Sequence, residues 1–481
     1  MNYPLHMNAS TTRAGVGIVT EAARPTQPSA VAAARTGTAV PAAMIGFGPV
    51  GQALYRALNL EELLPGFRVC KVLVRDQNKL RTVQDLDGCP VAVPSSLIAN
   101  SVEEIFADND FSIVVDVSNM EEPSVICRAL SSGRPVVSAN KRLLASHGRE
   151  FIRAAEDGGT FFLNEAAALG KVPVFKFISE FCARLRILRF ETICNGTTNF
   201  ILTQIANAGL SFEDALREAQ SNKYAEADAS SDIDGLDALH KAKLLTATAF
   251  GLDILAAETD EYIYCDGIRD IAEATCTFAA HCGRVVKLVA TSEMTDWGVA
   301  IRIMPTLLPK HSFLGSLEGV ENGIVVHDQL GPASEFAGPG AGPDATAAAF
   351  LSDLATAREC MENATVPRAF ARLTSADTNR LLPKETGTVR PVFQSYSPLH
   401  QVGVLAAKAD VVCSHGISVE QIYNSTRGMT DLTPDVIIGE RTTMGQALSA
   451  ARELSNLRCV TGAVKLLDVA GDEPIDLDVL I

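Results

Sequence analysis

A glycine-rich turn between an apolar run and a helical run is the feature that most constrains the fold of this chain. The run PAAMI ends at residue 45, and QALYRALNL, which has helical spacing, follows the turn. Glycines at this spacing allow a tight turn and a close backbone approach to a pyrophosphate, which then faces the first amides of the helix. We predict a dinucleotide site formed by Gly46, Phe47, Gly48, Pro49, Val50 and Gly51.

Strands and helices alternate through the first third of the chain. Apolar, strand-like runs occur at 67–75, 111–118, 134–139 and 159–166, and helical stretches separate them. This alternation predicts a doubly wound parallel sheet of the α/β class. We assign residues 39–165 to a Rossmann-like nucleotide-binding domain.

The order of elements changes in the rest of the chain. Residues 166–375 mix long helical stretches with apolar strands, which predicts an α+β domain with a separate sheet. Proline and charged residues over 376–390 indicate a linker. Residues 391–481 follow a βαββαβ order, which is the ferredoxin-like arrangement.

Composition narrows the class of protein. The net charge of −16 argues against a nucleic-acid partner, and no apolar run reaches the roughly 18 residues of a membrane span. The eleven cysteines are scattered without a CxxC pair, which favours free thiols in a reducing compartment. We expect a cytoplasmic protein. The first 38 residues are rich in alanine, proline and arginine, and we interpret them as a disordered tail, with an organellar import signal as the alternative.

The end of the second predicted strand bears on the choice of dinucleotide. Arg75 stands where an acid would bind the ribose 2′-hydroxyl of NAD, and Lys79 and Arg81 follow it. Cations at this position favour the 2′-phosphate of NADP. Asp76 weakens the argument, and a solvated loop cation is the alternative reading of Arg75. We predict NADP or NAD, with NADP favoured.

A cluster of carboxylates lies in the second domain. Residues 226–237 contain five acids, and a lysine follows one helical turn after the last of them. Asp237 and Lys241 are spaced i, i+4, so they share one face of a helix, where an exposed ion pair is the simplest explanation. An exposed ion pair does not explain why four other acids lie in the same stretch. Carboxylates grouped beside one lysine could instead bind an ammonium group and keep a proton donor ready.

These motifs resemble those of homoserine dehydrogenases. The stretch KYAEADASSDIDGLDALHKAKLL is similar to the signature of that family, and SANK (138–141), ICNGTTNFIL (193–202) and GPGAG (338–342) are similar to three further segments in the same order. The segment HQVGVLAAKADVVCSHGISVEQI resembles the ACT regulatory domain that many of these enzymes carry. The resemblance covers nearly the whole chain after the tail.

The resemblance implies reversible reduction of L-aspartate 4-semialdehyde to L-homoserine with NAD(P)H. Lys241 would donate the proton, and Lys141 would lie at the boundary of cofactor and substrate. Glu226, Asp237 and Asp232 would hold the amino acid, and Gly340 would contact the cofactor. The chemistry fits, because an ammonium group can stabilise and then protonate the developing oxyanion.

The resemblance also implies a structural monovalent cation, Na⁺ or K⁺, in the loop after residue 164. Glu165 would offer its side chain, and Ala168, Gly170 and Val172 their backbone carbonyls, which are ligands that a hard cation accepts. The chain departs from its relatives at Lys171. A lysine there would be strained if the backbone requires a positive φ, and its ammonium could take the place of the cation.

The sequence constrains the regulation and the oligomeric state of the protein less than it constrains the fold and the activity. The resemblance suggests feedback by threonine at the ACT-like domain, and a domain that only forms dimers is the alternative. We expect a homodimer or higher homo-oligomer whose second domain is both catalytic and dimerising. Two rivals remain for the activity: another amino-acid semialdehyde or imine reductase on the same fold, and a catalytically silent or altered-substrate nucleotide-binding ACT regulator.

Overall fold

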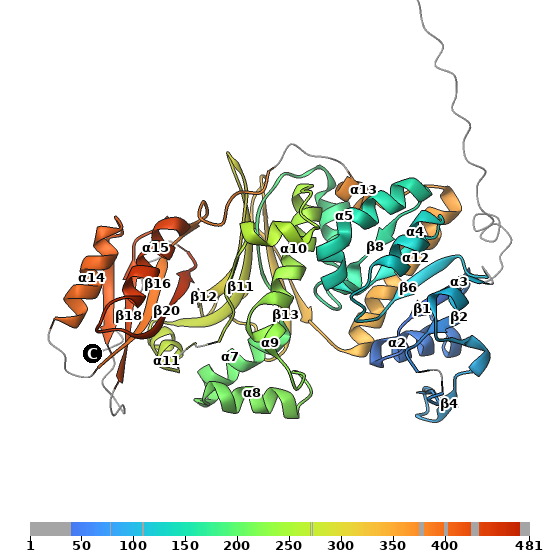
Figure 1. Cartoon of the computed structure of the whole chain (residues 1–481), viewed down its shortest axis with the longest axis horizontal. Coiled ribbons are helices and arrows are strands. Elements are labelled where there is room, and N and C mark those ends of the chain that lie inside the picture. Colours follow the sequence, from blue (N-terminus) through green and yellow to red (C-terminus); the bar gives the residue numbers. More distant parts are fainter. Residues whose placement is uncertain are drawn as a thin grey trace, which may run out of the picture.

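The computed structural model shows an elongated chain with nucleotide-binding elements at one end and a C-terminal unit at the other (Figure 1). It describes residues 40–76, 78–107, 110–269, 271, 273–374, 380–398, 403–424 and 432–471. The tail predicted over residues 1–38 lies outside the described residues. Among the described residues, no helix is both long and apolar enough to cross a membrane.

The N-terminal sheet has six parallel strands in the order β5-β2-β1-β6-β7-β8. In chain order this is the 3-2-1-4-5-6 arrangement of a Rossmann fold, so the predicted doubly wound parallel sheet is confirmed. The order reverses between β1 and β6, which is where such sheets bind ligands. The strands are β1 (Val40–Ile45), β2 (Phe67–Leu73), β5 (Ile98–Ala99), β6 (Ile113–Asp116), β7 (Val136–Ser138) and β8 (Phe162–Leu163).

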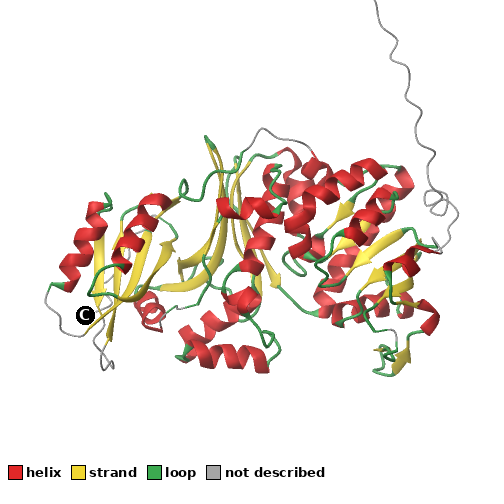
Figure 2. Ribbon diagram, in the orientation of Figure 1, coloured by secondary structure: helices red, strands yellow, loops and turns green. Residues whose placement is uncertain are grey.

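Helices cover both faces of this sheet (Figure 2). One of them comes from far along the chain: α12 (Pro343–Asn363) packs against α2 and appears in orange among the blue-green elements of Figure 1. Arg56 forms an ion pair with Asp344 at 2.6 Å across this contact. The nucleotide-binding end therefore includes residues beyond the predicted range 39–165. Its other helices are α2 (Pro49–Tyr55), η1 (Arg56–Leu60), η2 (Ser95–Leu97), α3 (Val102–Ala107), α4 (Ser124–Ser131) and α5 (Lys141–Gly158), and a small ribbon pairs β3 (Thr82–Gln84) with β4 (Pro90–Ala92).

The central part of the chain forms a mixed sheet. Strands β14, β13, β9, β11 and β12 are antiparallel neighbours, and β11 and β12 are the longest of these strands. Helices α7, α10 and α11 pack on β11. The strands are β9 (Ile187–Ile193), β10 (Tyr264–Cys265), β11 (Arg284–Thr295), β12 (Gly298–Pro309), β13 (Glu321–Asp328) and β14 (Ser334–Pro339). The helices are η3 (Glu165–Ala167), α6 (Val174–Glu180), η4 (Phe181–Arg184), α7 (Gly196–Ala208), α8 (Phe212–Ser221), α9 (Ser230–Ile233), α10 (Leu236–Phe250), η5 (Ala257–Tyr262), α11 (Glu273–His281) and α13 (Arg368–Thr374).

The C-terminal unit has the predicted βαββαβ order, and its sheet is continuous with the central one. The strand order is β20-β16-β18-β17, and β20 runs parallel to β12, with Thr306 opposite Asp468. Of the predicted linker, residues 380–390 are described, and Leu382 is buried beside β12. The loop at 399–402, before the first helix, lies outside the described residues. The elements are β15 (Thr388–Val389), β16 (Pro391–Pro398), α14 (Val404–Ser414), β17 (Val419–Asn424), β18 (Leu432–Gly439), β19 (Thr442–Thr443), α15 (Met444–Ser455) and β20 (Thr461–Val469).

A buried ion pair crosses the core of this C-terminal unit. Lys408 on α14 and Asp435 on β18 are both fully buried and form an ion pair. Ser395 and Ser397 on β16 accept hydrogen bonds from the same ammonium group. Removal of one partner from a buried pair leaves an uncompensated charge, which costs about 3–5 kcal/mol.

We therefore expect Lys408→Met to lower the free energy of unfolding by about 3–5 kcal/mol, because Asp435 would remain charged in an apolar core. Urea unfolding followed by circular dichroism measures this change. The double variant Lys408→Met/Asp435→Leu is the matched control and should regain most of the loss. A double variant no more stable than the single one would contradict the assignment.

Candidate active site

The glycine-rich turn lies at the carboxyl end of β1, as predicted. Gly46 has a φ of +94°, and a Cβ added to Gly51 would lie 3.1 Å from the carbonyl oxygen of Gly46. A Cβ added to Gly48 would meet nothing within 4 Å, so the backbone there is open to a ligand. The turn lines a cavity of about 650 Å³ at the point where the strand order reverses. These glycines fit a bound dinucleotide.

Arg75 lines the same cavity as the glycine-rich turn. Arg81 and Asp76 also lie on its wall, whereas Lys79 does not. The guanidinium group of Arg81 donates to the backbone carbonyls of Lys79 and Asp76, at 2.6 and 2.5 Å. Two arginines therefore face the space where a ribose bound by the turn would extend, with one aspartate beside them.

A second, larger cleft of about 870 Å³ contains the acid cluster. Its walls come from six parts of the chain: the loop after β6, the start of α5, the start of α7, the stretch 220–241, the residue before β13, and the loop before α12. All the residues predicted to catalyse the reaction or bind the substrate line it, namely Lys141, Glu226, Asp232, Asp237 and Lys241, together with Gly340.

Asp237 is at the centre of the charged groups in this cleft. It lies in the first turn of α10, and its Oδ2 is 2.8 Å from the Nζ of Lys241 on the next turn. Its Oδ1 is 3.1 Å from the Nζ of Lys141, which begins α5 directly after β7. The predicted i, i+4 pair is therefore buried and shared with a lysine from the nucleotide-binding end.

Two asparagines that the sequence reading did not single out complete this arrangement. Asn195 donates from Nδ2 to Asp232 at 2.7 Å and to Asp237 at 2.9 Å, while its Oδ1 caps the N-terminus of α7. An asparagine between a strand and a helix is a common capping signal, and it could have drawn attention to this position. Asn195 also holds two carboxylates together. This second role depends on contacts with α9 and α10, which lie further along the chain.

Asn322 supports Lys241 through the backbone of Cys194. The carbonyl oxygen of Cys194 accepts from the Nζ of Lys241 at 2.6 Å and from the Nδ2 of Asn322 at 3.3 Å. The side chain of Asn322 is buried against Gly340, where an added Cβ would lie 2.1 Å from it. Position 340 therefore has room only for glycine. The close contact with Asn322 places the loop before α12 at the edge of the cleft.

The charges in the cleft determine which groups are protonated. Burial alone would raise the pKa of Asp237, but Lys241 and Lys141 hold this pKa well below its usual range. Burial would lower the pKa of Lys241, but Asp237 raises it above its ordinary value. Burial and repulsion by Asp237 raise the pKa of Asp232. Lys241 is therefore an ammonium ion in the free protein, and Asp237 is a carboxylate.

The remaining predicted residues of the acid cluster differ in exposure. Glu226 is exposed at the rim of the cleft, and Asp232 is partly buried. Helix α10 is buried on nearly all sides, and its first residue, Leu236, is the exception at 45% exposed.

The two cavities are joined by a third one of about 210 Å³. It shares Ser118 and Asn119 with the nucleotide cavity, and Lys141, Lys241 and Gly340 with the acid cleft. A dinucleotide held at the glycine-rich turn could therefore extend toward both lysines. The nucleotide cavity, the third cavity and the acid cleft therefore border one another, with shared residues at each boundary.

Two buried carboxyl groups are neighbours at the predicted cation loop: Glu165 in the loop itself and Asp353 on α12. Glu165 accepts from the amides of Phe175 and Lys176 at 2.9 and 3.0 Å, and its own amide donates to Asp353 at 2.8 Å. Burial raises the pKa of Glu165 to about 7 and that of Asp353 to about 8. A nearby cation would favour the ionised forms, so this donor set fits a monovalent ion.

Backbone strain at Lys171 is absent. The positive φ in this loop belongs to Gly170, at +61°, and Lys171 is not among the described non-glycine residues with a positive φ. The side chain of Lys171 is exposed. The condition for strain is therefore not met, because the turn places its left-handed residue one position earlier, where the chain retains a glycine.

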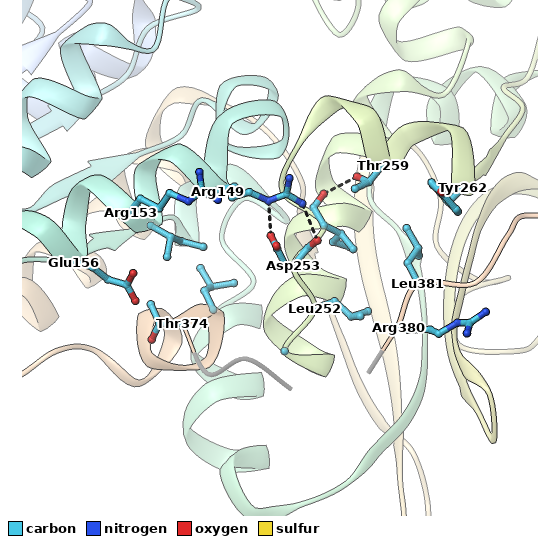
Figure 3. A pocket seen from close by; sticks show the side chains of 14 residues that line it. Arg149, Arg153, Glu156, Leu252, Asp253, Thr259, Tyr262, Thr374, Arg380 and Leu381 are labelled. Carbon is cyan, nitrogen blue, oxygen red and sulfur yellow. Dashed lines mark hydrogen bonds and ion pairs between the residues drawn. The ribbon is translucent and has the colours of Figure 1, made fainter. Parts of the chain in front are cut away.

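A separate cavity of about 550 Å³ lies near the other end of α10 (Figure 3). About 21 Å of helix separates its lining residue Gly251 from Asp237. The guanidinium group of Arg149 is bonded there to Asp253 at 2.9 Å and to Glu258 at 2.5 Å. The described residues on its walls include none of the predicted site residues, so we do not assign the reaction to it.

Comparisons with known proteins agree with this geometry. Residues 46–165 match the model of the homoserine dehydrogenase NAD-binding domain, and residues 173–355 match the homoserine dehydrogenase model. The homoserine dehydrogenase of Synechocystis is 30% identical over 443 residues, which cover 87% of this chain and 96% of that protein.

Solved structures lead to the same family. The crystal structure of a homoserine dehydrogenase from Thiobacillus denitrificans has a TM-score of 0.77 and 28% identity, over 90% of this chain and 98% of that one. A hyperthermophilic archaeal homoserine dehydrogenase in complex with NADPH has a TM-score of 0.55 and 26% identity, over 66% of this chain and 98% of that one. The chain belongs to the homoserine dehydrogenase family of nicotinamide-dependent oxidoreductases.

Proposed function

We propose that the acid cleft binds L-aspartate 4-semialdehyde or L-homoserine and that its two lysines serve their interconversion with NAD(P). The observation that carries this proposal is the single carboxylate of Asp237 between Lys141 and Lys241, at 3.1 and 2.8 Å. This arrangement keeps two ammonium groups on the wall of the small cavity that borders the nucleotide cavity. The bound nicotinamide supplies or accepts the hydride.

Lys241 is the proposed proton donor to the carbonyl oxygen. Reduction of an aldehyde develops negative charge on oxygen, which an ammonium group stabilises and then protonates. The raised pKa of Lys241 keeps this proton in place before the substrate arrives. Lys141 lies on the opposite side of Asp237 and is the proposed second cation at the boundary with the cofactor.

Glu226, Asp232 and Asp237 are the proposed partners of the substrate α-ammonium group. Asp232 and Asp237 are held together by Asn195, and Glu226 stands at the rim, where an entering substrate would meet it. Grouping these carboxylates costs energy through repulsion, so an arriving cation is favoured by relief of that repulsion.

NADP is the proposed preferred cofactor, with the path from Gly46 to Gly340 as its site. Arg75 and Arg81 line the cavity beside the turn, and a phosphate is a better partner for two guanidinium groups than a hydroxyl. The complex of the archaeal relative with NADPH supports the same choice. Asp76 on the same wall is the one feature that favours NAD.

The C-terminal βαββαβ unit is the proposed ACT-like regulatory domain, over residues 391–481, in a cytoplasmic homodimer or higher homo-oligomer. Threonine is the proposed effector, and dimer formation alone is the alternative role. The eleven cysteines all lie among the described residues and none of them forms a disulfide there, which supports a reducing compartment. A catalytically silent regulator is the alternative, and the presence of both Lys141 and Lys241 in the cleft argues against it.

We expect Lys241→Ala to lower the kcat of homoserine oxidation by about 10²–10⁴-fold, because the proton-transfer group would be lost. The affinity for nicotinamide nucleotides should stay near the wild-type value, because the glycine-rich turn is intact. Steady-state nicotinamide absorbance measures the first quantity and fluorescence titration the second. Lys310→Ala, an exposed lysine outside the cleft, is the control. Unchanged turnover in Lys241→Ala would remove this residue from the mechanism.

If Arg75 binds a 2′-phosphate, Arg75→Ala should raise the KM for NADP by about ten- to hundredfold, through loss of a charge-assisted hydrogen bond. The KM for NAD should change little, since NAD has only a hydroxyl at this position. Arg68→Ala, an exposed arginine at the other end of the same strand, is the matched control. An equal rise for both nucleotides would count against the assignment.

A monovalent cation at Glu165, Ala168, Gly170 and Val172 should appear in the pH dependence of stability. Glu165 and Asp353 have pKa values of about 7 and about 8 in the folded chain, against about 4 in an unfolded one. Between about pH 4 and pH 8 the folded state therefore binds more protons than the unfolded state, and the free energy of unfolding falls as the pH rises.

Because a bound cation favours the ionised pair, potassium or sodium chloride should raise the Tm at pH 8 by about 2–4 °C over choline chloride at equal ionic strength. The difference should shrink at pH 5, where both groups are protonated. In Asp353→Asn the loss of stability between pH 5 and pH 8 should be smaller. Equal Tm values in all three salts at pH 8 would contradict the cation site.

A further inference from the structure

The turn that connects α9 to α10 holds the two carboxylates of the cleft in place. Asp232 lies in α9 and Asp237 in the first turn of α10, so their separation depends on the turn at Asp234 and Gly235. Gly235 has a φ of +83°, which a non-glycine residue rarely adopts. Asp234 and Gly235 themselves have no role in the proposed chemistry.

The segment Tyr264–Arg269 packs directly on this turn. The amide of Ile268 donates to the carbonyl oxygen of Ile233 at 2.7 Å, and a Cβ added to Gly267 would lie 1.9 Å from the same oxygen. Arg269 binds both carboxylate oxygens of Asp234, from Nε at 2.7 Å and from Nη2 at 2.9 Å. The turn is therefore held by a backbone hydrogen bond and a bidentate ion pair.

The same segment is anchored in the C-terminal unit. Asp266 accepts from the Nζ of Lys465 on β20 at 2.7 Å, and the amide of Asp266 donates to Ile303 on β12 at 2.9 Å. The ring of Tyr264 packs against the buried core of the C-terminal unit. Residues 264–269 thus contact the last strand of the chain on one side and the acid-bearing turn on the other.

We propose that Asp234, Arg269, Asp266 and Lys465 are positioning residues through which the C-terminal unit sets the spacing of the substrate carboxylates. Lys465 holds Asp266, and the segment that follows Asp266 holds the turn that carries Asp232 and Asp237. A displacement of β20 is transmitted to the carboxylates because every link is a direct contact. This inference rests on the proposed binding of the substrate ammonium group by those carboxylates.

The role separates substrate binding from nucleotide binding. Asp234 and Arg269 lie outside the nucleotide cavity, so their loss acts on the carboxylates and leaves the glycine-rich turn unchanged. Asp234→Asn and Arg269→Met should each raise the KM for homoserine by about five- to tenfold, with the KM for NADP at its wild-type value. The double variant should show no larger rise than the single ones, because both remove one interaction.

Two further variants complete the test. Lys465→Met should raise the KM for homoserine in the same direction without a contact of its own to the cleft. Arg149→Met is the matched control, since Arg149 is also an ion-paired arginine, bound to Asp253 and Glu258, and lies near the far end of α10 (Figure 3). Its two KM values should stay at the wild-type level.

A KM for homoserine within about twofold of wild type in Arg269→Met would overturn the proposal, as would a parallel rise in both KM values. A shift in Arg269→Met without one in Lys465→Met would overturn the link to the C-terminal unit. Amide hydrogen exchange of residues 232–237 provides a readout independent of turnover, and it should speed up in Arg269→Met and Lys465→Met alone. A wild-type protein that does not oxidise homoserine would instead refute the proposed function, while the exchange measurement still judges the positioning.

Discussion

The buried carboxylate of Asp237 is the interaction on which the cleft depends. It neutralises Lys141 from the nucleotide-binding end and Lys241 from its own helix, at 3.1 and 2.8 Å. Asn195, at the start of α7, fixes one of its oxygens. Without this carboxylate, two ammonium groups would face each other in a partly buried space, which is costly. The carboxylate of Asp237 therefore holds the start of α5 and the start of α10 together at the cleft.

The C-terminal unit is part of the central sheet and is not held by the linker alone. Strand β20 pairs with β12, and Arg302 and Asp468 form an ion pair at 3.2 Å across that junction, both nearly inaccessible to solvent. The second oxygen of Asp468 accepts from the amide of Arg390 at 2.9 Å. Removing one partner of a buried, hydrogen-bonded pair is costly, so these contacts join the C-terminal unit to the central sheet in addition to the linker.

The sequence predicted features that depend on neighbours along the chain. The parallel sheet follows from alternating apolar runs, and the Asp237–Lys241 pair follows from one helical turn. Contacts between distant segments were not predictable in this way. Asn195 reaches Asp232, and α12 packs on α2, through contacts that no local pattern encodes. The sequence left the φ angle at Lys171 open for the same reason: which residue of a loop becomes left-handed is decided by its surroundings.

In the proposed function, the charges in the cleft couple binding of the substrate ammonium group to release of the proton from Lys241. Glu226, Asp232 and Asp237 line the cleft together with Lys141 and Lys241, so three formal negative charges stand against two positive ones. Burial, and then repulsion by Asp237, raise the pKa of Asp232. A substrate ammonium group compensates that charge. In doing so it weakens the hold of Asp237 on Lys241, whose pKa then falls toward a value at which the proton can be released. A lysine held too firmly to act in the free protein thus becomes a suitable acid when the amino acid is bound.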